Sequence, residues 1–367
     1  MTPDQLQHAI SPALTGYGFQ QTALIGMLPV LAPHLGLGAD RIGLAIGAGL
    51  VLSAVAAPLL AQAMTQRRLR GALLLQCAAS LALVLLLLWP PPNGMTFGVL
   101  LAIRGVQGTA AAVILAVAQG ASAGSGRPVA ALARVQIGPG LGRATGAALI
   151  GPLSRLSIAL PVLPALIGAG LSLRRLARPD GHHPDGIAVL ASPRCHAPRP
   201  AALLVPFLVQ AAIGAGQLGL GPRLALTRPP DEAATMAGLC LASGYLALLL
   251  VHARLTAAGV AMRPAAALLA AALALPAFLV APLALIVATA LAAGASGLLI
   301  ARHLARIITA RPESARHSAA WQGSALLAGL GSGAGAGALV LPLSPAAPFL
   351  LGAALSLVIL LICQRFT

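Results

Sequence analysis

The sequence predicts an all-α integral membrane protein in which twelve transmembrane helices form two pseudo-symmetric six-helix halves. Three observations predict this fold: the composition, the recurrence of long apolar segments, and a repeat that relates the two halves of the chain. Of the 367 residues, 58% are hydrophobic and only 8% are charged, and the mean hydropathy is +0.92. Soluble domains carry roughly 25% charged residues and disordered chains are polar, so the composition excludes both classes.

Apolar segments long enough to cross a bilayer recur along the whole chain. A spanning helix needs about 20 largely apolar residues, and charged residues or turns, as at 89–94 and 343–345, separate the segments. In the first half the segments are 11–33, 42–64, 71–89, 95–118, 129–150 and 156–173. In the second half they are 202–222, 233–253, 264–281, 283–301, 317–341 and 346–363. Because these segments are too apolar for barrel strands, each is predicted to be a helix.

The placement of arginine predicts the orientation of the chain. There are 23 arginines, no lysine and seven acidic residues, which give a net charge of +16. Because the arginines lie mainly between the apolar segments, nucleic-acid binding is disfavoured as their role. With the N-terminus in the cytoplasm, sixteen arginines fall in cytoplasmic loops or the C-terminal tail, four in external loops and three within spans. This positive-inside bias predicts that both termini are cytoplasmic and that the chain lies in the inner (cytoplasmic) membrane.

A polar stretch rich in Pro, Arg and His divides the chain at residues 174–201. We therefore expect an N-terminal six-helix half over residues 1–173, a cytoplasmic linker over 174–201 and a C-terminal six-helix half over 202–367. The linker holds a small group of His and Cys side chains whose spacing matches no zinc pattern: His182, His183, Cys195 and His196. No metal ion or other cofactor is predicted, and the scattered cysteines indicate no disulfide framework.

An internal repeat supports the division into two halves. A shift of 191 residues superimposes two sets of glycines, placing Gly138, Gly140, Gly142 and Gly146 on Gly329, Gly331, Gly333 and Gly337, and Gly47 on Gly238. Glycines four residues apart form a smooth stripe on one helix face, and small residues let helices in lipid approach closely. The stripes are Gly138, Gly142 and Gly146 in one half and Gly329, Gly333 and Gly337 in the other. Static packing explains them; a second interpretation is that these helices slide or rock across the interface between the halves.

Two motifs fall within the fourth and fifth predicted spans. Arg104-Gly105-Val106-Gln107-Gly108 has the pattern R-x-x-Q-G, and the next span carries Gly138-Pro139-Gly140-Leu141-Gly142 followed by Gly146 and Gly151-Pro152. With spans arranged as six plus six and a basic central loop, the chain resembles the major facilitator superfamily of secondary transporters. The first motif is similar to a signature of that family, and the second resembles a motif associated with its exporters. The resemblance implies a central cavity that opens alternately to each side of the membrane by rocking of the two halves.

A third motif of the same family is altered in this chain. The loop after the second span normally reads like G-x-L-A-D-R-x-G-R-K, whereas here it reads Pro58-Leu59-Leu60-Ala61-Gln62-Ala63-Met64-Thr65-Gln66-Arg67-Arg68. Gln62 stands where the family has an acidic residue, and Arg67 and Arg68 preserve the basic end of the motif. The resemblance therefore assigns these three residues, together with the two glycine stripes, to conformational gating.

Polar side chains within the spans are the candidate substrate-binding residues. Arg104 and Arg143 lie near the middle of their spans, where a charge costs at least ~2.5–3.5 kcal/mol. All seven acidic residues lie in tails, loops or span ends, so an anionic substrate that Arg can bind in bidentate fashion would relieve both cations. The candidate set is Arg104, Arg143, Gln107, Gln136, Tyr17, Gln20, Gln21, Gln210, Gln217, Trp321 and Gln322. Alternatively, Arg104 caps carbonyl groups of a neighbouring helix, and the glutamines join one helix to another.

Together these features favour secondary active transport of a small organic solute by alternating access. We expect export of an anionic metabolite, such as a carboxylate siderophore. The alternatives are multidrug efflux, uptake of a small organic anion, facilitated diffusion and, outside transport, a membrane-embedded enzyme. An enzyme is disfavoured because it would need clustered His, Asp and Glu, and only Asp231 and Glu232 cluster, at what looks like a helix start. No P-loop, GxSxG or HExxH motif occurs, which disfavours ATP-driven transport. The expected partners are the small-molecule substrate, the lipid bilayer and protons or another coupling ion, with no nucleic acid and a monomeric state.

Overall fold

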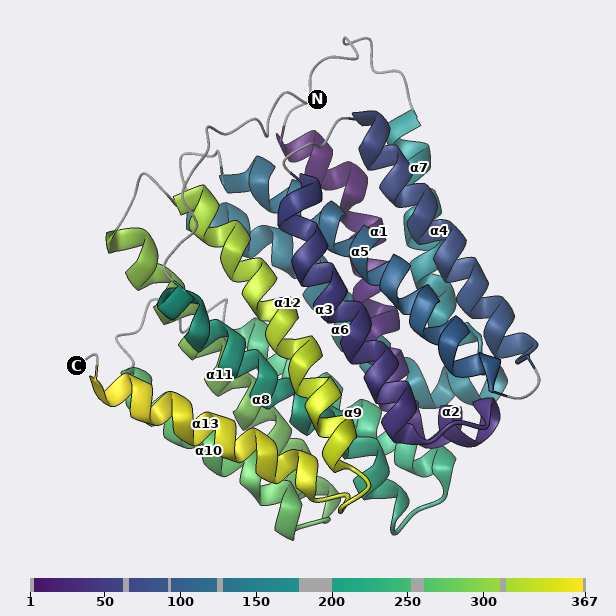
Figure 1. Cartoon of the computed structure of the whole chain (residues 1–367), viewed down its shortest axis with the longest axis vertical. Coiled ribbons are helices and arrows are strands. Elements are labelled where there is room, and N and C mark those ends of the chain that lie inside the picture. The colour runs from purple at the N-terminus through teal and green to yellow at the C-terminus, as the bar shows by residue number, and fades with distance from the viewer. Residues whose placement is uncertain are drawn as a thin grey trace.

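The computed structural model describes residues 3–61, 66–91, 94–123, 128–177, 200–251, 261–310 and 315–365. Within these ranges the chain forms thirteen α-helices, one short 3-10 helix and no strand (Figure 1). The first seven are α1 (Pro3–Gly26), α2 (Leu28–Leu35), α3 (Ala39–Ala61), α4 (Gln66–Leu88), α5 (Met95–Ala123), α6 (Pro128–Leu156) and α7 (Leu163–Ala177), with the 3-10 helix η1 (Leu160–Val162) before α7. The other six are α8 (Pro200–Ala225), α9 (Pro230–Leu250), α10 (Met262–Phe278), α11 (Pro282–Ala310), α12 (Ala315–Val340) and α13 (Ala347–Arg365).

Each predicted span overlaps a helix, but the first span is divided between α1 and α2. The division falls at Met27, whose backbone N–H still bonds the Ala23 carbonyl oxygen at 2.9 Å. Pro29 has no N–H to continue the ladder of hydrogen bonds and lies in the first turn of the new helix, which begins at Leu28. The short helix α2 ends at Gly36, where a φ of 61° requires the left-handed conformation that glycine adopts readily. The twelve predicted spans therefore correspond to thirteen α-helices.

Among the described residues, nine helices are long and apolar enough to cross a membrane. α10 is also apolar but has only 17 residues. Helices α1 and α6 are not among the nine although they have 24 and 29 residues, because both carry polar side chains such as Gln20, Gln21 and Arg143. The chain is thus a multi-pass membrane protein. Its two long helices of lower hydropathy, α1 and α6, carry several of the predicted substrate-binding residues.

The helices pack as two groups. In the first helix group (α1–α7), α1 lies against α6 and α7, and α5 lies against α3 and α4. In the second helix group (α8–α13), α8 lies against α12 and α13, and α11 lies against α9 and α10. Two extensive contacts, α3 with α12 and α6 with α9, join the groups. Figure 1 shows the first group to the right of the second, with α12 crossing beside α3.

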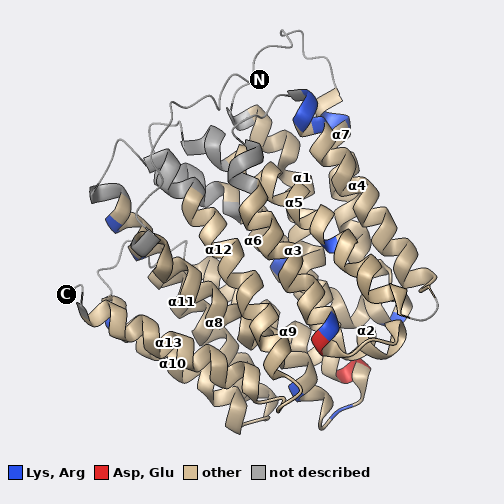
Figure 2. Ribbon diagram, viewed as in Figure 1, with Lys and Arg blue, Asp and Glu red and all other residues tan. Residues whose placement is uncertain are grey.

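Charged side chains lie mainly near the ends of the helices (Figure 2). Five arginines lie at the end of the bundle where the chain begins: Arg67, Arg68 and Arg70 at the start of α4, and Arg174 and Arg175 at the end of α7. The described acidic side chains belong instead to the first turns of α3 and α9, at the opposite end: Asp40, Asp231 and Glu232. The two ends of the bundle therefore differ in charge.

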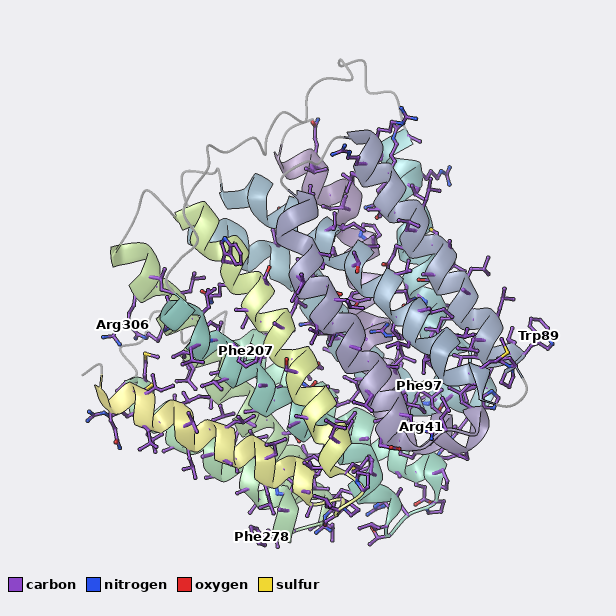
Figure 3. All side chains as sticks on the ribbon, viewed as in Figure 1. Arg41, Trp89, Phe97, Phe207, Phe278 and Arg306 are labelled. Atoms are coloured by element: carbon purple, nitrogen blue, oxygen red, sulfur yellow. The ribbon has the colours of Figure 1, made fainter. Side chains whose placement is uncertain are left out.

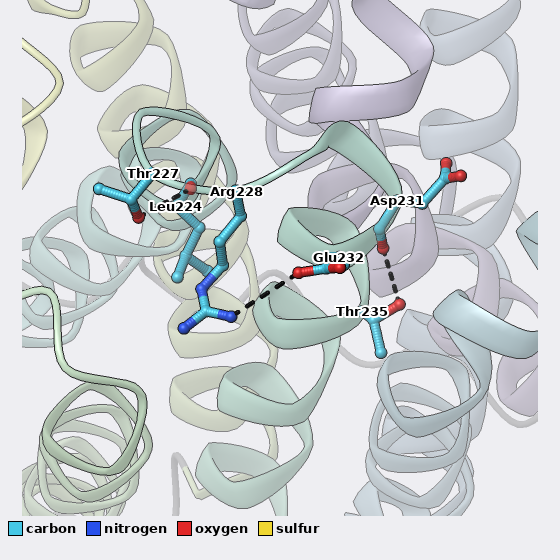
Figure 4. Close-up of polar contacts among 6 residues, drawn as sticks. All are labelled: Leu224, Thr227, Arg228, Asp231, Glu232 and Thr235. Carbon is cyan, nitrogen blue, oxygen red and sulfur yellow. Dashed lines mark hydrogen bonds and ion pairs between the residues drawn. The ribbon is translucent and has the colours of Figure 1, made fainter.

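The start of α9 shows why its acidic residues are structural. Arg228 Nη1 lies 4.0 Å from Glu232 Oε2, one helical turn away, and Thr235 Oγ1 donates a 2.7 Å hydrogen bond to the Asp231 carbonyl oxygen (Figure 4). Acidic side chains in a first turn interact favourably with the helix dipole. Asp231 and Glu232 thus begin a helix, as their position in the sequence indicates.

Large apolar side chains lie at the outer edge of the bundle, where lipid would surround it. Trp89, directly after α4, is 70% exposed, and Phe278, the last residue of α10, is 74% exposed. Figure 3 shows both rings projecting from the edge of the molecule. Aromatic rings at helix ends are typical of the boundary between lipid and water, so these two residues indicate where one membrane surface lies.

Candidate functional site

Arg143 lies where the two helix groups meet. This half-buried residue is on α6, and its Nη2 donates a 3.3 Å hydrogen bond to Oε1 of Gln21 on α1. Its guanidinium carbon lies 6.0 Å from the centre of the Tyr245 ring on α9. The Tyr245 hydroxyl in turn accepts a 3.2 Å hydrogen bond from Nε2 of Gln217 on α8. The cation on α6 is therefore surrounded by neutral groups from three other helices, with Gln217 joined to it through Tyr245. Its Nε has no hydrogen-bond partner.

Two cavities adjoin Arg143. The larger lies within the second helix group and also has Gln210, Gln217, Tyr245, Thr289 and Ser296 in its lining. The rest of its lining is mainly apolar side chains, among them Leu241, Leu273, Pro276 and Phe349. The smaller cavity is lined mainly by the first helix group and includes Tyr17 and Ser53. Among the described residues, Arg143 is the one charged side chain that lines these two cavities.

A second polar cluster surrounds Arg104, inside the first helix group. Arg104 Nη1 on α5 donates a 2.9 Å hydrogen bond to Oε1 of Gln107, three residues along the same helix. Gln107 and Gln20 of α1 pair through their amides, with hydrogen bonds of 3.1 and 3.3 Å. Gln107 Nε2 also lies 3.2 Å from Oγ of Ser80 on α4. We name Arg104, Gln107, Gln20 and Ser80, all fully buried, the Arg104 cluster.

Tyr17 lies between the Arg104 cluster and the smaller cavity. Its ring centre is 5.8 Å from the Arg104 guanidinium carbon, a distance typical of a cation–π contact. The same residue lines the smaller cavity together with Arg143. Arg104 itself lines neither of the two cavities. The two arginines that the sequence singles out therefore occupy different environments on either side of Tyr17.

The R-x-x-Q-G motif forms part of this arrangement. Arg104 and Gln107 are three residues apart, so both side chains point to one face of α5. Gly108 faces α3, where a Cβ atom would lie 2.6 Å from the Gly49 carbonyl oxygen. Only glycine allows α3 and α5 to approach this closely. The motif thus combines one polar face with one close helix contact.

The other predicted binding residues divide among these environments. Gln210 and Gln217 line the larger cavity, and Gln21 bonds Arg143. Gln322 on α12 is 3% exposed and its Oε1 has no hydrogen-bond partner, but neither Gln322 nor Trp321 is among the residues that line the two cavities. Gln136 belongs to α6, and its side chain lies outside the part of the chain that the structure describes.

Three polar residues of these sites were not predicted. Tyr245 contacts Arg143, Ser80 bonds Gln107, and Gln76 is fully buried with no partner for either side-chain atom. Gln76 and Ser80 share the buried face of α4, which continues through residues at intervals of three or four: Leu69, Leu73, Leu83 and Leu87. The interruption of this leucine pattern by two polar residues is the signal that could have identified them.

Each glycine stripe packs closely against one neighbouring helix. A Cβ on Gly142 would overlap the Thr15 carbonyl oxygen of α1, and a Cβ on Gly333 would overlap the Ala211 carbonyl oxygen of α8. The other stripe residues contact the same two helices: Gly138 and Gly146 meet α1, whereas Gly329 and Gly337 meet α8. Each stripe thus packs within its own helix group. The helices that carry the stripes, α6 and α12, also pack across the groups against α9 and α3, so the expectation that they slide or rock at the interface between the halves stays a prediction.

Other small residues form the contacts between the groups. A Cβ on Gly47 of α3 would lie 2.6 Å from the carbonyl oxygen of Gly331 on α12. Gly238 of α9 lies against the backbone of Ala147 on α6. The close approach between groups therefore depends on Gly47, Gly238 and Gly331.

The predicted loop motif after the second span is only partly described. Arg67 and Arg68 are exposed in the first turn of α4, and Gln62 lies outside the described residues.

Comparison with known proteins supports the fold. No protein-family model matches the chain, and no curated protein matches it. The solved structure of the human organic anion transporter MFSD10 (TETRAN) matches 99% of this chain and 100% of its own, with a TM-score of 0.68 and 16% identity. The nucleoside transporter NupG matches over 99% and 98% of the two chains with a TM-score of 0.64 and 16% identity, and a mutant of it gives 0.65 and 14%. These identities are low, so the likeness establishes a shared fold.

Proposed function

Because the chain has the fold of major facilitator transporters, as its sequence predicts, we propose that it is a secondary transporter of a small organic anion. The observation that carries this proposal is the position of Arg143. Of the side chains that the structure describes, it is the one charged group lining the two cavities, and it lies where α6 and α9 join the helix groups. A cation at that position can bind a solute and respond to movement of one group against the other.

The surroundings of Arg143 favour an anionic ligand. Its described partners are the neutral Gln21 amide oxygen and the face of the Tyr245 ring, and its Nε is free. A buried cation without a counter-ion is costly in a membrane, and a carboxylate binds guanidinium through two parallel hydrogen bonds. One solved structure with this fold is that of an organic anion transporter. These observations together support an organic anion as the substrate.

The cavity lining supports a particular kind of anion. Its single cation would balance one negative charge, whereas the apolar side chains, including Leu273 and Phe349, would cover an apolar body. Gln210, Gln217 and Thr289 offer hydrogen bonds to neutral polar groups. We therefore propose a monoanion with an apolar part. A carboxylate-rich siderophore is matched less well, because its further carboxylates would meet no cation among the lining residues.

We propose alternating access between two six-helix halves as the transport mechanism. Matching contacts support it: α6 packs its glycine stripe on α1, and α12 packs its stripe on α8. Rocking of one half against the other at the α3–α12 and α6–α9 contacts would open the site alternately to each side. The Gly- and Pro-rich sequence of α6, which resembles an exporter motif, supports export. The arginines near the start of α4 and the end of α7 support cytoplasmic termini in an inner membrane.

Metabolite profiling tests the proposed function. Cells and medium are compared between a deletion strain and a strain that overproduces the protein. We expect a small organic anion to be retained in the deletion cells and enriched in the medium of the overproducing strain. Depletion of that anion from the medium would indicate uptake instead of export. A neutral or cationic compound that responds to the protein would contradict the assignment of substrate class.

Substitutions of Arg143 then test the site. Arg143→Gln should abolish transport of the anion, and Arg143→Lys should retain part of it, because lysine keeps the charge but loses the bidentate geometry. Arg228→Gln is the matched control, since it removes an arginine from a partly exposed ion pair outside both cavities. Equal transport by Arg143→Gln and Arg228→Gln, at equal protein levels in the membrane, would exclude Arg143 as the binding residue.

A further inference from the structure

The Arg104 cluster has more hydrogen-bond donors than its own acceptors satisfy. Of the Arg104 nitrogens, Nη1 bonds Gln107, but Nε and Nη2 have no partner. The Tyr17 hydroxyl is also without a partner. The two amide oxygens in the cluster are already used, since Gln107 Oε1 accepts from Arg104 and Gln20, and Gln20 Oε1 accepts from Gln107. An unsatisfied buried donor costs about 1–3 kcal/mol, and more when it is charged.

The charge of the cluster is also unbalanced. Arg104 is fully buried, and the described acidic side chains lie in the first turns of α3 and α9, at the end of the bundle. The Tyr17 ring and the Gln107 oxygen offset only part of the cost of a buried guanidinium. A bound group that carries one negative charge and accepts several hydrogen bonds would satisfy both deficits. Free donors and an uncompensated positive charge exclude a metal cation as that group.

The enclosure of the cluster limits the size of the ligand. Gln20, Gln76, Ser80, Arg104 and Gln107 are each 0% exposed, and Tyr17 is 8% exposed. Arg104 lines neither of the two cavities that adjoin Arg143, so an organic anion with an apolar body does not reach it without rearrangement. A small inorganic anion needs far less space. Tyr17, which lines the smaller cavity, is the side chain that would move to admit it.

Gln76 supplies a further donor from α4. It precedes Ser80 by one helical turn, so both face the same side of α4, and Ser80 contacts Gln107 of the Arg104 cluster. Neither the nitrogen nor the oxygen of the Gln76 amide has a partner, although the residue is fully buried. Its amide can rotate to direct the nitrogen toward an anion. Helices α1, α4 and α5 therefore each contribute a side chain with unused donor capacity.

We propose that Arg104, Tyr17 and Gln76 bind a small monovalent inorganic anion such as chloride within the first helix group. The site has its own cation, Arg104, and shares only Tyr17 with the smaller cavity beside Arg143, so the proposal does not depend on organic anion binding at Arg143. Bound chloride would neutralise Arg104 and link α1, α4 and α5, so it would stabilise the folded protein. Because a ligand that binds only the folded state raises stability with its concentration, the site has a readout that needs no transport substrate.

Thermal unfolding of the purified full-length chain tests the proposal. The protein in detergent is titrated with sodium chloride or sodium bromide at constant ionic strength, with sodium gluconate as the balancing salt. We expect a saturable rise in Tm with both halides. Arg104→Gln should remove the saturable rise, whereas Arg143→Gln should keep it. A Tm that does not differ between chloride and gluconate, or a halide response lost in Arg143→Gln and kept in Arg104→Gln, would overturn the proposal.

Two milder variants and a direct observation keep the test decisive if Arg104→Gln does not fold. Gln76→Leu and Tyr17→Phe should each weaken the apparent halide affinity about tenfold, which corresponds to the loss of one charge-assisted hydrogen bond. Anomalous diffraction from bromide in crystals of the unmodified protein should place the ion beside the Arg104 guanidinium. Unchanged affinity in both variants, or bromide located only elsewhere, would show that the cluster is not the site.

Discussion

The guanidinium of Arg143 on α6 faces the ring of Tyr245 on α9, with 6.0 Å between the guanidinium carbon and the ring centre. The contact joins the two helix groups across one of their two long interfaces. Because α1 also bonds Arg143 through Gln21 and α8 bonds Tyr245 through Gln217, the pair connects four helices. A ligand that binds Arg143 is therefore in a position to alter the contact between the groups.

The aromatic face of Tyr245 should contribute to ligand affinity. Tyr245→Leu removes the ring from beside Arg143, and a cation–π contact is worth ~0.5–2 kcal/mol, so we expect the Kd of the organic anion to rise about 2- to 30-fold. Tyr245→Phe is the matched control because it keeps the ring and loses only the bond from Gln217. Calorimetric titration of the two variants checks this, and equal Kd values for Leu and Phe would show that the ring face is not used.

The ion pair at the start of α9 should matter little for stability. Arg228 and Glu232 are four residues apart, their charged atoms are 4.0 Å apart, and the Glu232 side chain is 57% exposed. Exposed pairs of this spacing contribute ~0.3–0.5 kcal/mol and are screened by salt. We expect Glu232→Gln and Arg228→Gln to leave the Tm within about one degree of the unmodified protein, a small shift consistent with that energy. A larger fall would show that this helix start is coupled to the rest of the fold.

The orientation of the bundle can be checked by labelling single cysteines in intact cells. In a variant lacking the four native cysteines, Gly94→Cys should react with a membrane-impermeant maleimide from outside, because Gly94 lies in the turn between α4 and α5. Arg174→Cys at the end of α7 should react only after permeabilisation, since the arginines there predict a cytoplasmic location. The reverse pattern would show that the positive-inside bias has been assigned to the wrong face.

Much of the fold follows from the sequence because the membrane imposes simple requirements. Length and apolar composition locate the spans, since a helix must satisfy its own backbone hydrogen bonds in lipid. The glycine repeat also has a structural counterpart: Gly142 meets Thr15 and Gly333 meets Ala211. The repeat does not, however, specify the partner of a stripe, because glycine spacing alone carries no information about which helix will pack on it. The stripes consequently lie within the groups rather than between them.

The candidate site is less predictable because it depends on how each helix is rotated. Arg104 and Arg143 look equivalent in the sequence, as cations near the middle of adjacent spans. In the fold, Arg104 points into the first helix group, whereas Arg143 points to cavities between and within the groups. Tyr245 was missed because its importance comes from contact with α6, which is about a hundred residues away. Helix rotation and long-range pairing together decide which polar residues meet.

Close packing at the glycine stripes should be more sensitive to added volume than neighbouring glycines are. Gly333→Ala places a methyl group against the Ala211 carbonyl oxygen of α8, and overpacking of this kind costs about 1–3 kcal/mol. Gly335→Ala on the same helix is the matched control, because no heavy atom lies within 4 Å of the added carbon and alanine favours a helix by up to about 1 kcal/mol over glycine. We expect Gly333→Ala to lower the Tm in detergent and Gly335→Ala to leave it unchanged or raise it. Equal shifts in the two variants would indicate that α8 and α12 separate at this point without cost, and would remove the structural basis for pairing α6 with α1 and α12 with α8.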